Sequence, residues 1–111
     1  MPVLRLLVWV YLLLAASAAR ADAGWTDYGR VIELVPTTRH YYEFQLAVKR
    51  NQSGCRDDDW FYLDYDLPGS DKMFDLLLES VKNTLRLRVY VTGVCNLRGY
   101  SEISAVSASP N

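Results

Sequence analysis

The sequence predicts one small, mainly β domain built from five strands and a single helix. Two observations carry this prediction. Several short segments alternate between hydrophobic and polar residues, and only one segment has its hydrophobic residues at helical spacing. The chain has 111 residues, of which 50% are hydrophobic and 13% aromatic. This length allows a single domain, and this composition excludes a disordered polar chain. The net charge of −1 argues against nucleic-acid binding through bulk positive charge.

Three strands are predicted in the first half of the domain. The run Gly29–Val35 is rich in β-branched residues, and Pro36 is expected to end it. The segment Tyr41–Val48 alternates as in a half-buried antiparallel strand, and Trp60–Tyr65 does the same. The side chains expected to point into the core are Tyr42, Phe44, Leu46, Val48, Phe61, Leu63 and Tyr65.

One helix is predicted after the break at Leu67-Pro68-Gly69, from Asp71 to Asn83. Ser70 is the expected N-cap, and Asp71 in the first turn suits the helix dipole. A single hydrophobic stripe is expected to face the sheet. It consists of Met73, Phe74, Leu77, Leu78, Val81 and Leu85.

Two more strands complete the domain. Leu85–Val91 alternates clearly, with Arg86, Arg88 and Tyr90 on its polar side, and Thr92-Gly93 is expected to end it. Tyr100–Val106 is a weaker strand, and residues 107–111 are predicted to be a flexible tail.

Three strands, a helix and two strands is the element order of the OB-fold, a five-stranded, partly open β-barrel. We therefore expect a single OB-fold domain over residues 24–106, with the helix between strands three and four covering one end of the barrel. An open α+β sandwich made of the same elements is the alternative.

Residues 1–23 have the order of a secretory signal peptide. Arg5 precedes an uncharged hydrophobic stretch, and small residues follow, so that cleavage after Ala21 and cleavage after Ala23 fit equally well. The stretch is shorter than the roughly 20 residues that a membrane span needs, although an uncleaved anchor is the alternative. We expect a secreted or periplasmic protein with no membrane span after cleavage.

The two cysteines, Cys55 and Cys95, are predicted to form a disulfide bond, because an even pair in a small exported domain is oxidised. The competing interpretation, a metal or catalytic thiol, lacks support because no second Cys or His stands at metal-ligand spacing from either cysteine.

No catalytic, cofactor or metal motif stands out, so we expect no enzymatic activity, no cofactor and no metal. The acidic run Asp57–Asp59 lacks the spacing of a calcium loop. His40 is a candidate general base, because the pKa of histidine lies near neutrality. Asp64 and Asp66 are a candidate pair of acids for glycoside hydrolysis. A solvated turn histidine and solvated strand-end carboxylates are the simpler interpretation of all three.

The aromatic residues are the better indication of function, because they exceed what one hydrophobic face requires. OB-folds bind oligosaccharides or oligonucleotides on a sheet face and its loops. Cross-strand packing is the competing role for tyrosines on a strand. The candidate binding surface consists of Trp25, Tyr28, Tyr41, Trp60, Tyr62 and Tyr90.

Several short segments resemble one group of small exported bacterial proteins. They are Gly24-Trp25-Thr26, Gly54-Cys55, Trp60-Phe61-Tyr62-Leu63, the helix segment 72–78, and the strand segment 86–95 that ends in Val94-Cys95. The group is similar to the B subunit of subtilase-type toxins. Such subunits are OB-folds that assemble as rings of five and bind sialylated glycans on host cells. The resemblance therefore implies a binding module, with a glycan as ligand and a homo-oligomeric ring as its assembly.

Three functions stay open at this point. The first is an exported binding protein, similar to a toxin B subunit, that recognises a glycan or a protein. The second is a periplasmic enzyme inhibitor or immunity-type protein, which would act in a one-to-one complex through an acidic patch. The third is a small hydrolase that depends on His40 or Asp64.

Overall fold

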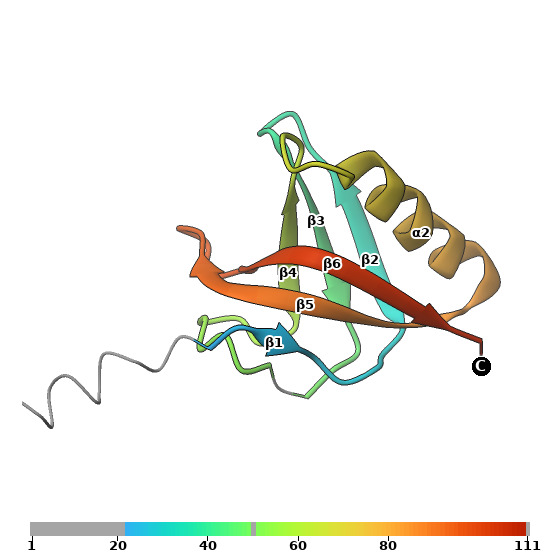
Figure 1. Ribbon diagram of the computed structural model, residues 1–111, viewed down its shortest axis with the longest axis horizontal. Helices are drawn as coiled ribbons and strands as arrows, with labels where there is room; N and C mark the ends of the chain where they lie inside the picture. Colours follow the sequence, from blue (N-terminus) through green and yellow to red (C-terminus); the bar gives the residue numbers. More distant parts are fainter. Residues whose placement is uncertain (1–21, 50, 111) are drawn as a thin grey trace, which may run out of the picture.

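The computed structural model describes residues 22–49 and 51–110 of the chain. The predicted signal peptide lies outside the described residues except for Asp22 and Ala23. The described residues form six strands and one helix, whose arrangement Figure 1 shows. In chain order they are β1 (Gly24–Trp25), β2 (Val31–Pro36), β3 (Tyr41–Leu46), β4 (Trp60–Asp64), α2 (Ser70–Asn83), β5 (Arg86–Cys95) and β6 (Ser101–Ser109).

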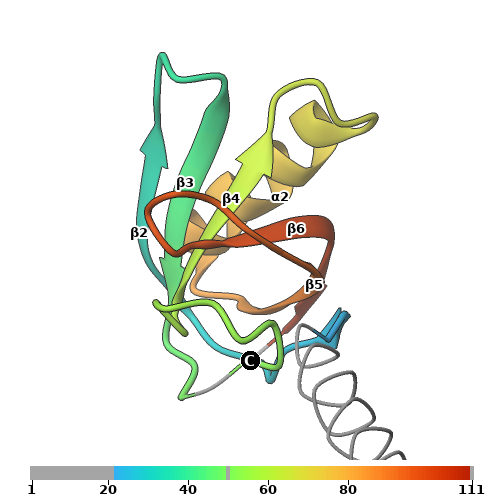
Figure 2. The same cartoon turned by 90° about the vertical axis from the view of Figure 1, so that its left-hand side faces the viewer.

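All six strands form one sheet in the order β1-β5-β6-β4-β3-β2. The pairs are antiparallel except for β4 and β6, which run parallel. Figures 1 and 2 show β5 and β6 crossing the direction of β2, β3 and β4, so that the sheet is strongly twisted. The mainly β class and the helix between the third and fourth predicted strands are confirmed.

The structure has six strands where five were predicted, and the sheet is not a closed barrel, so the five-stranded OB-fold is not confirmed. The chain after Asp22 supplies a short strand, β1, that the sequence analysis missed, because two residues are too few to show any alternation. β1 occupies one edge of the sheet beside β5, and β2 occupies the other edge beside β3. The sheet therefore stays open.

Several strand ends also differ from the predictions. Pro36 belongs to β2, since an edge strand tolerates a residue without an N–H group. β5 continues past Gly93 to Cys95, with a shift in register that the left-handed Gly93 accommodates. β6 runs to Ser109, so residues 107–109 pair with the start of β5 instead of forming a flexible tail.

The core lies on the inner face of the twisted sheet, and α2 covers one end of it. Phe44 and Phe61 stack with ring centroids 5.4 Å apart where β3 and β4 pair, and both side chains are fully buried. The alternation read from the sequence is confirmed here, because every second residue of β3, β4 and β5 points inward. The fully buried core side chains are Phe44, Leu46, Phe61, Leu63, Leu77, Leu87, Val89, Val91 and Ile103.

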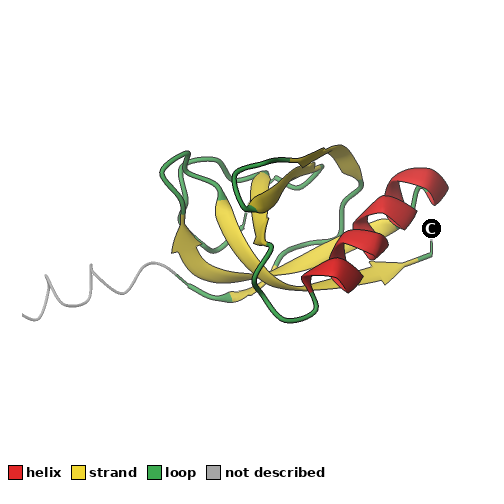
Figure 3. Ribbon diagram, turned by 90° about the horizontal axis from the view of Figure 1, so that it is seen from above, coloured by secondary structure: helices red, strands yellow, loops and turns green. Residues whose placement is uncertain are grey.

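The helix is confirmed, but its cap and its buried face differ from the prediction. Gly69, not Ser70, is the N-cap, and the Ser70 hydroxyl instead donates a hydrogen bond to the Tyr65 carbonyl. Figure 3 shows α2 at one end of the sheet, where it packs against β2 and β6. Leu77 and Ser80 are buried, and Met73 and Leu76 pack against the core beside them, whereas Val81 of the predicted stripe is exposed.

The predicted disulfide bond is confirmed. Cys55 and Cys95 are joined with their Cα atoms 5.6 Å apart. The bond ties the segment before β4 to the end of β5 across the helical connection. Within residues 22–49 and 51–110, no helix is both long enough and apolar enough to cross a membrane.

Candidate functional site

The outer face of the sheet, defined as the side opposite the core, carries the predicted aromatic surface. Tyr41, Trp60, Tyr62 and Tyr90 stand on strands β3, β4 and β5 at positions that alternate with the buried core residues. Trp25 of β1 pairs with Tyr90 in the sheet and contacts it edge to face, with ring centroids 5.5 Å apart. Five of the six predicted residues therefore share this face.

A line of contacts crosses the outer face from β5 to β3. The Thr92 hydroxyl donates a hydrogen bond of 3.0 Å to Glu102, and the Tyr62 hydroxyl donates one of 3.4 Å to the same carboxylate. Tyr62 in turn meets Tyr41 edge to face at 5.5 Å. Because these residues come from four adjacent strands, the outer face is a continuous polar and aromatic surface rather than a set of separate side chains.

Tyr62 is the most deeply packed of the predicted residues, with 8% of its surface exposed. Burial, with a further contribution from the charge of Glu102, raises the pKa of Tyr62 to about 12. Its role is therefore packing within the face, which was the competing interpretation for these tyrosines.

This buried phenol makes a testable prediction about stability at high pH. The fold favours the neutral phenol, so its contribution to stability is complete below the ordinary pKa of about 10 and is lost as the pH rises through about 12. Ultraviolet titration of tyrosinate should show an ionisation near pH 12 that Tyr62→Phe removes. Tyr90→Phe is the matched control and should leave that ionisation in place. Burial also raises the pKa of Tyr42, so Tyr42→Phe is a second control, and an ionisation near pH 12 of unchanged amplitude in Tyr62→Phe would contradict the assignment.

At one end of the outer face, two loops converge on a buried carboxylate. Arg98, in the β5–β6 loop, donates hydrogen bonds of 2.9 and 2.7 Å to the two oxygens of Glu43. Arg39, between β2 and β3, forms a second ion pair with the same carboxylate, whose side chain is only 3% exposed. The contact with Glu43 raises the pKa of Arg98. The ion pairs fix both loops against β3.

Aromatic rings surround this ion-pair cluster. Trp60 stacks on Tyr100 with ring centroids 5.2 Å apart. The guanidinium of Arg98 lies 5.7 Å from the centre of the Tyr100 ring, and that of Arg39 lies 5.9 Å from the Tyr41 ring. Sequence reasoning did not single out Arg39, Glu43 or Arg98. The short spacing between Arg39 and Glu43 is visible in the sequence and could have indicated an ion pair. The contact between Arg98 and Glu43 joins distant parts of the chain, so it depends on the tertiary structure.

At the other end of the face, arginines pack on the aromatic residues of the N-terminal segment. The Arg88 guanidinium lies 4.5 Å from the centre of the Trp25 ring and 5.1 Å from that of Tyr28, and Arg86 lies 5.8 Å from Tyr28. Within the described part of the chain, neither arginine has a carboxylate in ion-pair range. The Nε atom of Arg88 is buried and has no hydrogen-bond partner there. Tyr28, the sixth predicted residue, therefore lies against Arg86 and Arg88 at this end of the outer face.

A hollow of about 360 Å³ opens beside Trp25. Trp25 is 39% exposed, the largest exposed aromatic side chain in the described residues. The Gln52 amide donates a hydrogen bond of 3.0 Å to the Trp25 carbonyl and so fixes the loop against β1. The hollow is shallow and open, and the amides of Asn51 and Gln52 beside it are hydrogen-bonded to Asp58, Ser53 and Trp25. It is lined by Trp25, Thr26, Asp27, Asn51 and Gln52.

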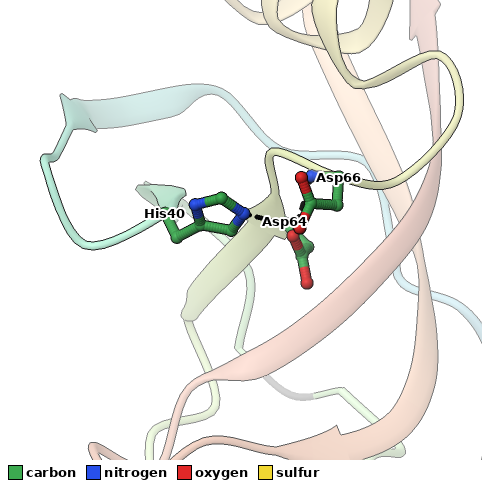
Figure 4. Close-up of side chains that lie close together, drawn as sticks. All are labelled: His40, Asp64 and Asp66. Carbon is green, nitrogen blue, oxygen red and sulfur yellow. Dashed lines mark hydrogen bonds and ion pairs between the residues drawn. The ribbon is translucent and has the colours of Figure 1, made fainter.

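The three residues that are candidates for acid–base chemistry come together where β3 begins and β4 ends (Figure 4). His40 precedes β3, Asp64 ends β4, and Asp66 follows in the next turn. His40 Nε2 lies 2.6 Å from Asp66 Oδ2, and the side chains of both residues are largely exposed. The hydrogen bond and the charge of Asp66 raise the pKa of His40 above its ordinary value.

The acidic run 57–59 is divided among separate partners. Asp59 accepts a hydrogen bond of 2.7 Å from the Gln45 amide, and Asp57 lies 3.8 Å from Arg56. The run is therefore a loop whose charges are partly compensated.

No family model, curated protein or solved structure matches this chain.

Proposed function

We propose that the protein is an exported, non-enzymatic binding module that recognises a glycan at the hollow beside Trp25. The observation that carries this proposal is the combination of a half-exposed indole ring with Asp27, Asn51 and Gln52 around one concavity. Sugars offer C–H faces that pack on aromatic rings and hydroxyl groups that pair with carboxylates and amides. A ligand pocket of this kind, apolar on one wall with a few convergent polar groups, is typical of small-molecule sites.

The order of the strands matches that of an OB-fold if residues 24–36 are counted as one bent strand, and this match supports a binding role. β1 pairs with β5, Gly29 forms a further bridge to Leu87 of β5, and β2 then pairs with β3 at the opposite edge. On this count five strands and one helix follow the order of an OB-fold, a fold that binds oligosaccharides on its surface. The resemblance to B subunits of subtilase-type toxins belongs to the same proposal, as does a ring of five copies.

The first experiment measures glycan binding by the mature chain on a glycan array, followed by titration of the best ligand. Trp25→Ala should weaken binding at least about tenfold, because it removes the packing wall of the hollow. Trp60→Ala is the matched control: it removes the same side chain from the far end of the outer face and should leave the affinity unchanged. The native mass from light scattering tests the ring independently.

Each outcome has a distinct meaning. Absence of binding to any glycan would overturn the glycan as ligand. Loss of binding in Trp60→Ala, with Trp25→Ala unaffected, would move the site to β3 and β4 and overturn the assignment to the hollow. A monomeric mass would exclude the ring without affecting the hollow.

A protein partner is the second candidate, as in an enzyme inhibitor, and the β5–β6 loop favours it. Leu97 is fully exposed at this loop, and Val94 is 51% exposed. The disulfide bond at Cys95 and the ion pair of Arg98 hold the two sides of the loop in place. A rigid loop with an exposed leucine suits insertion into a hydrophobic pocket. Loss of a one-to-one protein complex in Leu97→Ser, with glycan binding absent, would favour this function.

A further inference from the structure

We propose that His40, Asp64 and Asp66 form a binding site for a divalent transition-metal cation, with Zn²⁺ as the cation that the donor set suits best. One ligand atom from each residue lies within 4.8 Å of the other two. Figure 4 shows the imidazole of His40, just before β3, directed toward the two carboxylates at the end of β4 and in the turn that follows. The proposal revises the sequence-based expectation of no metal, because sequence spacing does not show that His40 approaches Asp64 and Asp66.

The distances require only a small adjustment. Zinc binds imidazole nitrogen and carboxylate oxygen at about 2.0 to 2.2 Å in a tetrahedral arrangement, so two ligand atoms on one ion lie about 3.3 to 3.6 Å apart. A rearrangement of about 1 to 1.5 Å in these side chains, of which His40 and Asp66 are exposed, brings the three atoms to that spacing. At present His40 Nε2 and Asp66 Oδ2 share a proton across 2.6 Å. Metal binding exchanges this bridging proton for the cation, which both atoms can then ligate.

The backbone holds the two contributing segments together without a metal. Tyr41 pairs with Asp64 in the β3–β4 register, which places the residue before β3 opposite the end of β4. The Tyr65 N–H donates a hydrogen bond of 3.0 Å to the His40 carbonyl. The Asp66 N–H donates one of 2.9 Å to Asp64 Oδ1, which leaves Oδ2 free of that bond. Less conformational entropy is therefore lost on binding than in a flexible loop.

The local charge favours a cation. Two carboxylates and a neutral imidazole carry a charge of −2, which compensates a divalent ion. In the described ranges, no lysine or arginine lies within ion-pair distance of Asp64 or Asp66, whereas Arg39, the neighbour of His40, is paired with Glu43. The exposed position leaves further coordination places to water or to a ligand from another molecule, as in zinc sites that keep an open position.

The test is calorimetric titration of Zn²⁺ alone into the disulfide-intact mature chain, in a buffer that does not chelate zinc. We expect saturable binding of one ion per chain. His40→Asn and Asp66→Asn should each weaken it at least about tenfold. Asparagine is chosen at position 40 because it tolerates the left-handed conformation there, with φ of 77°. Asp58→Asn, which neutralises an exposed acid elsewhere, is the matched control and should bind zinc as the unmodified chain does.

A second measurement does not depend on substitution. His40 is the only histidine in the sequence, so its imidazole nitrogen signals in NMR spectra can be assigned without ambiguity. Zinc should shift the Nε2 signal strongly and in proportion to the calorimetric saturation. Absence of saturable binding, an Nε2 signal that zinc leaves unchanged, or binding that survives in both variants would overturn the proposal. Because the glycan site lies elsewhere, none of these results bears on the proposed function.

Discussion

Replacing Cys55 and Cys95 together by serine is expected to lower the free energy of unfolding by about 3 to 4 kcal/mol. The bond links residues 40 positions apart. In the chain-entropy description, opening a loop of that length releases about 4 kcal/mol of conformational freedom in the unfolded chain. The bond also ties the connection before β4 to the end of β5, two segments that are adjacent only in the folded state. A domain of this size has few other ways to offset such a loss.

Urea denaturation of the oxidised chain and of the double serine variant measures the effect. The oxidised chain treated with a reductant is a second comparison, because it keeps both sulfur atoms and should lose nearly the same stability. A loss below about 1 kcal/mol in both comparisons would contradict the prediction. It would mean that β4 and β6, with the helix, hold this part of the sheet together without the covalent link.

Leu77→Ala is expected to destabilise the domain by about 2 to 5 kcal/mol. The Leu77 side chain is fully buried between α2 and the sheet. Removing it takes away hydrophobic contact and leaves a cavity that the surrounding strands fill only in part. Leu78, the next residue of the same helix, is 37% exposed, and Leu78→Ala is the matched control. Its expected cost is below about 1 kcal/mol, since most of its surroundings can relax or are solvent.

The same denaturation experiment decides between two orientations of the helix. The sequence-based stripe treats Leu77 and Leu78 as equal members of the buried face. Equal losses in the two variants would support that stripe and would contradict the orientation described above. A large difference, with Leu77 the sensitive position, fits a helix that buries Ser70, Leu77 and Ser80 and packs Met73 and Leu76 beside them.

Much of the fold follows from local patterns. The alternation in β3, β4 and β5 identified Phe44, Phe61 and Val89 as core residues, because in a half-buried strand the side-chain pattern directly reflects burial. The rotation of α2 did not follow from its pattern. Ser80 faces the core and Val81 does not, since the Ser80 hydroxyl satisfies its hydrogen bond within the helix, at the Leu76 carbonyl. The hydrophobic stripe of the sequence is wider than the face that the helix buries, so the stripe alone did not determine which residues of α2 face the core.

The strands missed or shortened by sequence reasoning have a common cause. β1 has two residues, and the end of β6 consists of serine and alanine, so neither has a hydrophobic pattern of its own. Both form because β5 offers a partner along its length. Strand propensity depends on the neighbouring strand, which a single sequence does not reveal.

The candidate site was predictable in its residue types but not in its grouping. Aromatic residues in excess of the core did lie on the outer face, and Trp25 with Tyr90 formed a contact there. The convergence of His40 with Asp64 and Asp66 depends on the register of β3 against β4. The approach of Arg98 to Glu43 depends on a loop far along the chain. Such long-range contacts leave no local signal.

The pairing of β1 with β5 also determines when the domain can fold. Among the described residues, Gly24 begins the first strand of the sheet and pairs with Val91, and the parallel partner of β4 is β6, the last of the described strands. A polypeptide that emerges from its amino end therefore completes β2, β3 and β4, which pair with one another, before β5 and β6 exist. Neither β1 nor the inner edge of β4 has its partner until the final third has been made. Such non-local pairing slows folding, because β4 and β1 complete their pairing only once β5 and β6 are present.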